Sequence, residues 1–358
     1  MREPPASILE HVPLADHSTL GVGGPARYFL AAQTLAEATE ALAWARESEL
    51  PVTLLGGGSN VVIADAGLPG LVLQLADGQC ELLDATEDLV RIRAGAGMPW
   101  DALVSRAVAR GFGGIECMSG IPGMVGAAPI QNIGAYGQEV AEVIEAVEVL
   151  DMQTGIVFWL SAAECGFAYR DSVFKRQPHQ HLVCSLRLRL RPNAQPDVRY
   201  AQVAHALAGE PLPDGAAGLT RVRDVVLRLR RDKAMVVDPE EPDSRSVGSF
   251  FTNPVVPVQV AVDAADRLRH SLRPGETMPS WPAPGGIKLS AAWLIEHAGM
   301  PKGYGEGPVG LSNKHTLALV NRGGATAADV LAFADHVAQR VQDASGVQLQ
   351  REPVLLGF

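Results

Sequence analysis

A glycine-rich stretch at residues 111–137 constrains the fold of this chain more than any other feature. Its core reads GIPGMVGAAPIQNIGAYG, with glycine at positions 120, 123, 126, 134 and 137, and it is too long to be a turn. A backbone with so few side chains can follow a flat ligand and read the edge of a heteroaromatic ring. We expect Gln131 and Asn132 to orient that ring. A buried packing loop is the weaker interpretation, because both amides would then need protein partners.

The flanking sequence predicts an α/β first third and a β-rich middle. Strands are expected at residues 26–32, 52–55, 61–63, 89–94 and 182–190, helices at 34–50 and 100–110, and a β-hairpin at 147–160. Parallel pairing is expected in the first third. A polar, proline-rich passage at 191–214 breaks this pattern, so we place a domain boundary near residue 215. Beyond it we expect helices at 220–233 and 327–345, a strand at 316–320 and an apolar stretch at 347–358.

Composition limits the class of protein. The 358 residues suggest two or three domains, and 47 % hydrophobic with 20 % charged residues exclude a disordered chain. Thirty Lys and Arg against 40 Asp and Glu give a net charge of −10, which disfavours broad contact with nucleic acid or anionic lipid. The four cysteines have no metal-ligand spacing, and neither a signal peptide nor a membrane span is apparent. We therefore expect a cytoplasmic protein with reduced thiols and no metal.

Two further glycine motifs have different meanings. Residues 55–60, LGGGSN, follow an apolar strand, so their N–H groups could approach a diphosphate. A tight turn is the alternative. Residues 21–26, GVGGPA, fit the loose dinucleotide-binding pattern, but polar residues precede them and Pro25 precedes a strand rather than a helix. The sequence therefore supports no Rossmann domain.

Three short motifs have simple structural explanations when each is taken alone. Residues 167–172, FAYRDS, could form an Arg–Asp pair with a serine cap, and residues 248–254, GSFFTNP, could form a turn. Glu352 could be a surface charge. Their order along the chain is more informative than any one of them.

That order resembles the MurB family of UDP-N-acetylenolpyruvoylglucosamine reductases, flavoenzymes of peptidoglycan synthesis. The resemblance covers about residues 19–357, and PIQNIGAYG is similar to the type I subgroup, which has a tyrosine loop over the substrate. It implies an α+β fold: a two-subdomain FAD-binding region of the vanillyl-alcohol-oxidase (PCMH) type plus a smaller α/β C-terminal substrate-binding domain. The implied limits are 18–193 for the FAD-binding domain (subdomains about 1–75 and 76–214), 215–346 for the C-terminal domain, and 347–358 for a segment returning to the active site.

The resemblance also implies an activity, that of a UDP-N-acetylmuramate dehydrogenase. NADPH would reduce non-covalent FAD and leave. UDP-N-acetylglucosamine enolpyruvate would then take hydride from flavin N5 at the vinyl carbon distal to its carboxylate. We expect a monomer in the cytoplasm, with no nucleic-acid or membrane partner.

Three catalytic residues follow from matching the family motifs. Hydride addition creates an enolate-like dianion, which needs positive charge or donors where charge develops. Arg170 of YRDS would supply them, and Glu352 would assist only if protonated or bonded to a donor. Ser249 of GSFF would donate the proton to the carbon next to the carboxylate. Because a serine hydroxyl is weakly acidic, a strongly basic carbanion must form first.

The remaining site residues are implied by the same matches. Those for FAD are Gly56, Gly57, Gly58, Ser59, Asn60, Gly120, Ile121, Pro122, Gly123, Gly126, Gln131, Asn132, Gly134, Ala135 and Tyr136. Those for the substrate are Tyr200, Lys233, Asn253 and Lys288, with Lys302 and Lys314 as further candidate cations. The run from Lys233 to Asp238 is two residues longer than the family pattern, which leaves the reach of Lys233 to the diphosphate open.

Two other functions are weighed against the reductase. An FAD oxidase of the same broad fold often tethers its flavin through His or Cys, and no His lies in or beside GGGSN in the sequence. A nucleotide-sugar sensor would have no use for a proton donor. The joint presence of Arg170, Ser249 and Glu352 therefore favours an enzyme.

Overall fold

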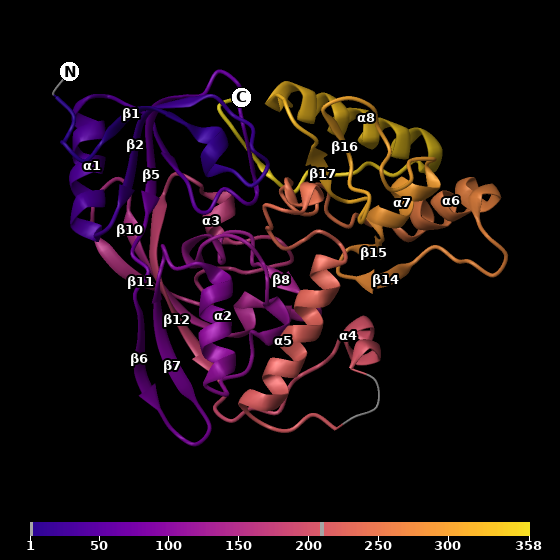
Figure 1. The fold of residues 1–358 in the computed structure, drawn as a ribbon, viewed down its shortest axis with the longest axis horizontal. Coiled ribbons are helices and arrows are strands. Elements are labelled where there is room, and N and C mark those ends of the chain that lie inside the picture. Colours follow the sequence, from indigo (N-terminus) through magenta and orange to yellow (C-terminus); the bar gives the residue numbers. More distant parts are fainter. Residues whose placement is uncertain (1–2, 208–210) are drawn as a thin grey trace. The chain divides into compact units, whose positions relative to one another are not determined.

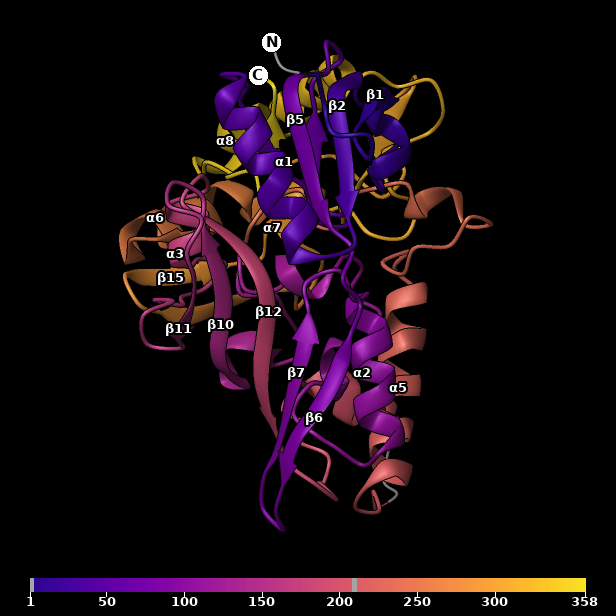
Figure 2. The same ribbon diagram turned by 90° about the vertical axis from the view of Figure 1, so that its left-hand side faces the viewer.

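The protein is described by a computed structural model that covers residues 3–207 and 211–358 (Figures 1 and 2). Residues 1–2 and 208–210 fall within the predicted subdomains but outside the described residues. The chain divides into two compact units. The first comprises the residues through Val12, Ala26–Gly57 and Leu68–Arg231, and the second comprises Pro13–Pro25, Gly58–Gly67 and Asp232–Phe358.

The first unit begins with a small sheet of order β1-β2-β5-β3. Its strands are β1 (Leu9–Pro13), β2 (Pro25–Ala32), β5 (Leu68–Leu75) and β3 (Val52–Leu54). β2 and β3 both pair with β5 in parallel, which confirms the predicted pairing. Helix α1 (Leu35–Glu47) packs its apolar side on this sheet, and Thr34 caps it by accepting the Glu37 N–H at 3.2 Å.

A larger sheet of order β11-β10-β12-β7-β6 completes the first unit. Its strands are β11 (Val157–Ser161), β10 (Ile144–Asp151), β12 (His181–Leu190), β7 (Val90–Gly95) and β6 (Cys80–Ala85). β10 and β11 form the predicted hairpin. Helix α2 (Trp100–Ala109) buries Trp100, Leu103 and Val104 in the core of this sheet. The short helices are α3 (Val173–Arg176) and α4 (Ala201–Ala206), and the ribbon β8 (Gly134–Ala135)–β9 (Gln138–Glu139) spans the end of the glycine-rich passage.

The second unit combines short strands with three helices. The strands are β4 (Val61–Ile63), β13 (Val255–Val256), β14 (Ser280–Ala283), β15 (Gly286–Leu289), β16 (Val309–Leu311), β17 (Leu319–Asn321) and β18 (Val354–Leu356), and the helices are α6 (Val258–Leu268), α7 (Ala291–His297) and α8 (Ala327–Ser345). α8 matches the predicted helix. A Thr326–Asp329 capping box begins it and the left-handed Gly346 ends it. In the described ranges, no helix has the length and apolar composition needed to cross a bilayer.

The division between the units differs from the boundary that we placed near residue 215. Helix α5 (Ala216–Arg231) belongs to the first unit, because its Val222, Val225 and Val226 share a core with Cys117 and Val203. Figure 1 shows α5 alongside α2. The first unit therefore ends at Arg231 rather than near residue 215.

The expected N-terminal subdomain is also divided. β4 pairs in parallel with β18, near the C-terminus, instead of joining the β1-β2-β5-β3 sheet. This pairing places residues 58–67 in the second unit. The strand expected at 316–320 begins later, at Leu319, because the Ser312 hydroxyl accepts the N–H groups of Lys314 and His315 and holds the preceding residues in a turn.

Candidate active site

The two glycine motifs of the first unit meet. A Cβ atom on Gly57 would lie 2.8 Å from the Gly123 Cα, and one on Gly56 would lie 3.0 Å from the Ala127 Cβ. A side chain at position 57 would not fit, because the backbones of the two loops touch there. Loop packing therefore accounts for these glycines, in addition to any need for ligand access.

Four backbone donors remain where these loops meet. The N–H groups of Gly56, Gly57, Gly123 and Met124 donate to no residue in the described part of the chain. All four residues are partly exposed. The Gly56 carbonyl accepts the Gln74 amide at 2.6 Å, and the Gly123 carbonyl accepts the Trp100 N–H at 2.9 Å, so both loops are fixed. Several fixed, available N–H groups form a site suited to an anionic ligand such as a diphosphate.

This contact gives a first prediction. In Gly57→Ala the new methyl group would press on the Gly123 backbone, and overpacking of this kind costs about 1–3 kcal/mol. We expect the variant to unfold at a lower temperature and to retain less flavin per protein after gel filtration. Gly78→Ala is the matched control, since its Cβ would meet only the Met98 Cα at 3.9 Å. Equal flavin content in both variants would contradict the prediction.

Asp101 is a site residue that the sequence reasoning missed. Its carboxylate accepts the Gly120 N–H at 2.6 Å and binds both terminal nitrogens of Arg223 at 2.6 and 2.7 Å. Burial raises the pKa of this carboxyl, but the hydrogen bonds from Arg223 and Gly120 outweigh burial and leave the pKa lowered. Asp101 thus attaches Gly120, the first glycine of the 120–137 core, to α5. No local spacing connects these residues in the sequence.

The rest of the passage is partly occupied by structural contacts. Gly126 donates to the Ala96 carbonyl at 2.9 Å, and its missing Cβ would meet Ala96. Ile121 donates weakly to Met118, and Pro122 and Gln131 are partly exposed. Gly134 and Ala135 form β8.

Asn132 differs from its predicted role. Its side chain is buried, with 1 % exposure, and it donates to the Glu139 carboxylate at 2.8 Å and to the Ala168 carbonyl at 3.1 Å. Its Oδ1 accepts the Ala141 N–H at 3.0 Å. Both amide hydrogens are therefore committed to the protein, so this side chain does not orient a ring as we expected. Only the backbone of residue 132 is then left to contact a ligand.

The Arg170 guanidinium lies on the glycine-rich passage. Its terminal nitrogens donate to the Asn132 carbonyl at 3.3 Å and to the Gly134 carbonyl at 3.0 Å. Asp171 pairs with Arg176 instead of Arg170, so the simple Arg–Asp interpretation of this motif is wrong. The serine cap is correct, because Ser172 caps α3. A guanidinium carries five N–H donors in a planar fork, a geometry that also matches a carboxylate.

Tyr200 and Tyr136 are brought together in the first unit. Their rings pack edge to face, with centroids 5.5 Å apart. Tyr200 is 47 % exposed and immediately precedes α4. Arg199 holds this segment through Asp197 and Glu142 at 2.6 and 2.9 Å. A predicted substrate residue therefore adjoins a predicted cofactor residue.

The second unit contains the other half of the GGGSN motif. The Gly58 carbonyl accepts the Thr19 N–H at 3.1 Å, and a Cβ on Gly58 would collide with the His17 carbonyl. A histidine thus lies beside GGGSN in space, although not in sequence. Partly exposed Ser59 follows. Asn60 donates to the Glu352 carbonyl at 3.4 Å and accepts the Val354 N–H at 3.0 Å.

Ser249 and Glu352 lie on adjoining extended segments of the second unit. The Glu352 N–H donates to the Phe250 carbonyl at 2.9 Å, and the Thr252 N–H donates to Gln350 at 3.0 Å. Ser249 forms a bridge with Ala318 on its other side. Among residues 3–207 and 211–358, none hydrogen-bonds to the Ser249 hydroxyl, which leaves this group available to a ligand.

The predicted substrate residues of the second unit are differently placed. Asn253 Oδ1 accepts the Ala291 N–H at 2.9 Å, at the start of α7, so this atom already has a structural role. Lys288 lies on β15, and Lys314 pairs with Glu241. Lys233 comes two residues after the end of α5.

Lys233 and Lys302 both act electrostatically on one side chain of the second unit, that of His315. Burial and, to a smaller extent, the charges of Lys233 and Lys302 together lower the pKa of His315 to about 4. Both lysines therefore act on one imidazole, which is neutral at pH 7. Lys233 and Lys302 together provide a region of positive potential in the second unit.

His315 also gives a pH prediction. Its folded pKa, about 4, lies below the ordinary value of 6.5, so protonation favours unfolding and stability falls as pH decreases below 6.5. Removing the imidazole in His315→Gln should make the variant lose about 2 kcal/mol less than the wild type between pH 7 and pH 5. Urea unfolding at both pH values measures this. His270→Gln, at an exposed histidine in the 3-10 turn 269–271, is the control. Parallel losses in wild type and His315→Gln would refute the assignment.

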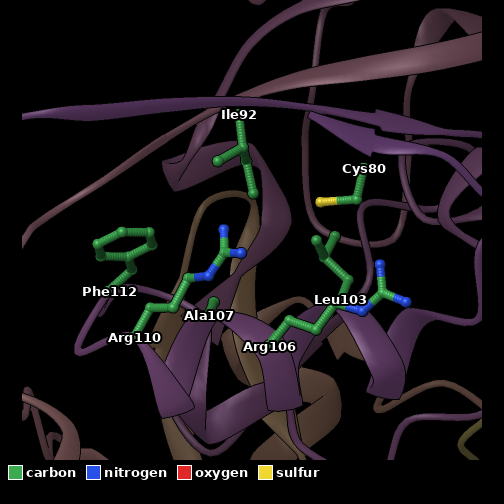
Figure 3. Close-up of a pocket in the computed structure, with 7 residues that line it drawn as sticks. All are labelled: Cys80, Ile92, Leu103, Arg106, Ala107, Arg110 and Phe112. Carbon is green, nitrogen blue, oxygen red and sulfur yellow. The ribbon is translucent and has the colours of Figure 1, made fainter. Parts of the chain in front are cut away.

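A separate pocket lies between α2 and the strands β6 and β7 (Figure 3). It is open to solvent, and its lining residues are Cys80, Ile92, Leu103, Arg106, Ala107, Arg110 and Phe112. None of them is a predicted site residue. The pocket is therefore not the candidate active site.

Comparison with known proteins connects these features. Residues 26–161 match the family model described as FAD binding domain, which confirms the predicted class of cofactor. Residues 239–356 match the model described as UDP-N-acetylenolpyruvoylglucosamine reductase, C-terminal domain. Together the two matches confirm the predicted fold class.

Relatives match over nearly the whole chain. UDP-N-acetylenolpyruvoylglucosamine reductase of Thermobifida fusca is 47 % identical, with 98 % of each chain covered. That of Streptomyces coelicolor is 44 % identical, covering 99 % of this chain and 91 % of its own. The crystal structure of the Thermus caldophilus reductase superimposes with a TM-score of 0.65 at 29 % identity, over 97 % of this chain and 98 % of that one. The chain therefore belongs to the UDP-N-acetylenolpyruvoylglucosamine reductases, a family of oxidoreductases.

Proposed function

We propose that this protein uses NADPH to reduce the enolpyruvyl group of UDP-N-acetylglucosamine enolpyruvate, giving UDP-N-acetylmuramate for peptidoglycan precursor synthesis. The observation that best supports this proposal is the placement of Ser249 next to the segment of Glu352. These residues are far apart in sequence, yet the Glu352 N–H donates to the carbonyl of Phe250, the residue after Ser249. A proton donor and a carboxyl group on adjoining segments suit the protonation of a carbanion.

The residues of the first unit fit FAD. Gly56, Gly57, Gly123 and Met124 offer backbone N–H groups that no described residue uses, and these would hold the diphosphate. When bound, FAD supplies the two-electron transfer between NADPH and the vinyl carbon distal to the carboxylate. The protein's own contribution is to hold the reactants, stabilise charge and deliver a proton.

Three side chains would act on the substrate. Arg170, whose guanidinium lies on the Asn132 and Gly134 carbonyls, binds the carboxylate where negative charge develops. Glu352 stabilises the same region in its protonated or hydrogen-bonded form. Ser249 then donates its hydroxyl proton to the carbon next to the carboxylate. Arg170 belongs to the first unit, and Glu352 and Ser249 belong to the second.

Local cations would bind the rest of a polyanionic substrate. The chain carries a net charge of −10, but screening over about 10 Å leaves only nearby charges effective. Lys233 and Lys302, which both act on His315, are the best-supported pair, with Tyr200, Lys288 and the Asn253 amide as further contacts. Lys314 contributes less, since Glu241 neutralises it.

Anaerobic half-reactions test the proposal. NADPH should bleach the flavin absorbance, and UDP-N-acetylglucosamine enolpyruvate should then restore it with formation of UDP-N-acetylmuramate, identified by mass spectrometry. Failure of UDP-N-acetylglucosamine enolpyruvate to restore the flavin absorbance would refute the proposal. NADH in place of NADPH gives the cofactor preference in the same experiment.

Acid precipitation distinguishes the reductase from the FAD oxidase alternative, because it shows whether the flavin is covalently attached. The His17 backbone lies beside Gly58, so a histidine is near GGGSN in space and the alternative is worth testing. We expect the flavin to remain in the supernatant after precipitation. Flavin that stays with the pellet would favour the oxidase.

A further inference from the structure

The turn at residues 168–171 carries Arg170 in a strained conformation. Arg170 has φ of +54°, in the left-handed region that residues other than glycine, asparagine and aspartate rarely adopt. Ala168 and Asp171 exchange two backbone hydrogen bonds, of 3.0 and 3.1 Å, that close the turn around it. Such strain persists only where the surroundings hold the residue in place.

The glycine-rich passage supplies that support through three successive attachments. The Ser172 hydroxyl donates to the Ile130 carbonyl at 2.6 Å, on one side of the turn. The Asn132 amide donates to the Ala168 carbonyl at 3.1 Å, on the other side. The Arg170 guanidinium itself then returns to the Asn132 carbonyl at 3.3 Å. Asn132 thus contacts both the turn and the side chain that the turn carries.

The Asn132 amide is itself fixed in one orientation. It donates to Glu139 at 2.8 Å, accepts from Ala141 at 3.0 Å, and is almost fully buried. Asn132 also has a left-handed φ, of +46°, which asparagine tolerates. Only an amide provides one acceptor and two donors here, because a carboxylate could not donate to Ala168 or Glu139.

We propose that Asn132 is a positioning residue for the proposed reaction, which fixes the direction of the Arg170 guanidinium by holding both the Ala168 carbonyl and the Arg170 side chain. This inference rests on the role of Arg170 in the proposed function. Asn132 contacts the substrate only through Arg170.

The test is Asn132→Gly, which keeps the left-handed backbone and removes the three side-chain hydrogen bonds. Misplacement of a reacting group by about 1 Å costs up to about 10²-fold in rate. We expect reoxidation of the reduced enzyme by UDP-N-acetylglucosamine enolpyruvate to slow by about 10- to 100-fold, with kcat falling more than KM rises. Reduction by NADPH, and the Kd of the apoprotein for FAD from fluorescence quenching, should change less than about twofold. Asn193→Gly is the matched control, because Asn193 is also left-handed, with φ of +43°, but lies beside Gly215.

A double variant shows whether Asn132 acts through Arg170. If it does, adding Asn132→Gly to Arg170→Lys should slow reoxidation by less than about twofold beyond Arg170→Lys alone. Fully multiplicative effects, or a wild-type rate in Asn132→Gly while Arg170→Lys is slow, would overturn the positioning role. If Asn132→Gly does not fold, Asn132→Asp serves, because it keeps the acceptor for Ala141 and loses both donors. A wild-type rate in Arg170→Lys would instead overturn the proposed function of Arg170 itself.

Discussion

Replacing Ser249 with alanine should leave reduction by NADPH nearly intact and slow reoxidation by UDP-N-acetylglucosamine enolpyruvate by about 10²–10⁴-fold, the usual contribution of a general acid. In the proposed reaction the hydroxyl would be needed only for protonation of the carbon next to the carboxylate, and not for reduction by NADPH. No described residue hydrogen-bonds to this hydroxyl, so its loss leaves no protein group without a partner. Stopped-flow absorbance under anaerobic conditions measures the two half-reactions separately.

Two controls accompany Ser249→Ala: a substitution at a second serine, and a measurement of the wild type in D2O. Ser271→Ala, at a partly exposed serine whose hydroxyl donates to the Leu268 carbonyl, should leave both rates unchanged. In D2O the wild-type reoxidation should slow, because the transferred proton comes from an exchangeable hydroxyl. Equal slowing of both half-reactions in Ser249→Ala would show that Ser249 maintains the site's structure and is not the proton donor.

The sequence predicts the regular elements better than their grouping into units. Helix α8 and the β10–β11 hairpin follow local periodicity and turn signals, so they are found where expected. The grouping depends on pairing between distant segments, such as β4 with β18 and α5 with the Cys117 core. No local pattern encodes either partner, and for this reason the boundary near residue 215 is displaced to Arg231.

For the site, too, the sequence predicts the segments better than it predicts the roles of single residues. Motif order identifies the segments of Ser249 and Glu352, which the structure places side by side. It cannot distinguish a side chain that meets a ligand from one that holds the loop, as Asn132 illustrates. Asp101 is also beyond sequence reasoning, because its partners Gly120 and Arg223 are brought to it only by packing of α2 and α5.

The second large effect is expected from Arg170→Lys, although the substitution keeps the positive charge. Arg170 donates through two nitrogens to the Asn132 and Gly134 carbonyls, and the geometry of its planar fork matches that of a carboxylate. A lysine has a single nitrogen with three donors, so it cannot contact both carbonyls and present a fork. Removing a donor that stabilises developing charge costs about 10²–10³-fold in rate, and we expect reoxidation to slow by that factor.

The decisive measurement is whether the loss of activity in Arg170→Lys appears in kcat or in KM. Because Arg170 would act on charge that grows during the reaction, kcat should fall while KM changes little. Reduction by NADPH should be unaffected. Lys175→Met is the control, since among the described residues the Lys175 ammonium donates only to the Arg170 carbonyl, at 2.9 Å, and is no part of the guanidinium. A Lys175→Met rate close to wild type, beside a slow Arg170→Lys, attributes the effect to the guanidinium. A rise in KM alone would instead make Arg170 a residue of ground-state binding, and charge stabilisation in the reaction would then have to come from Glu352 and its neighbours in the second unit.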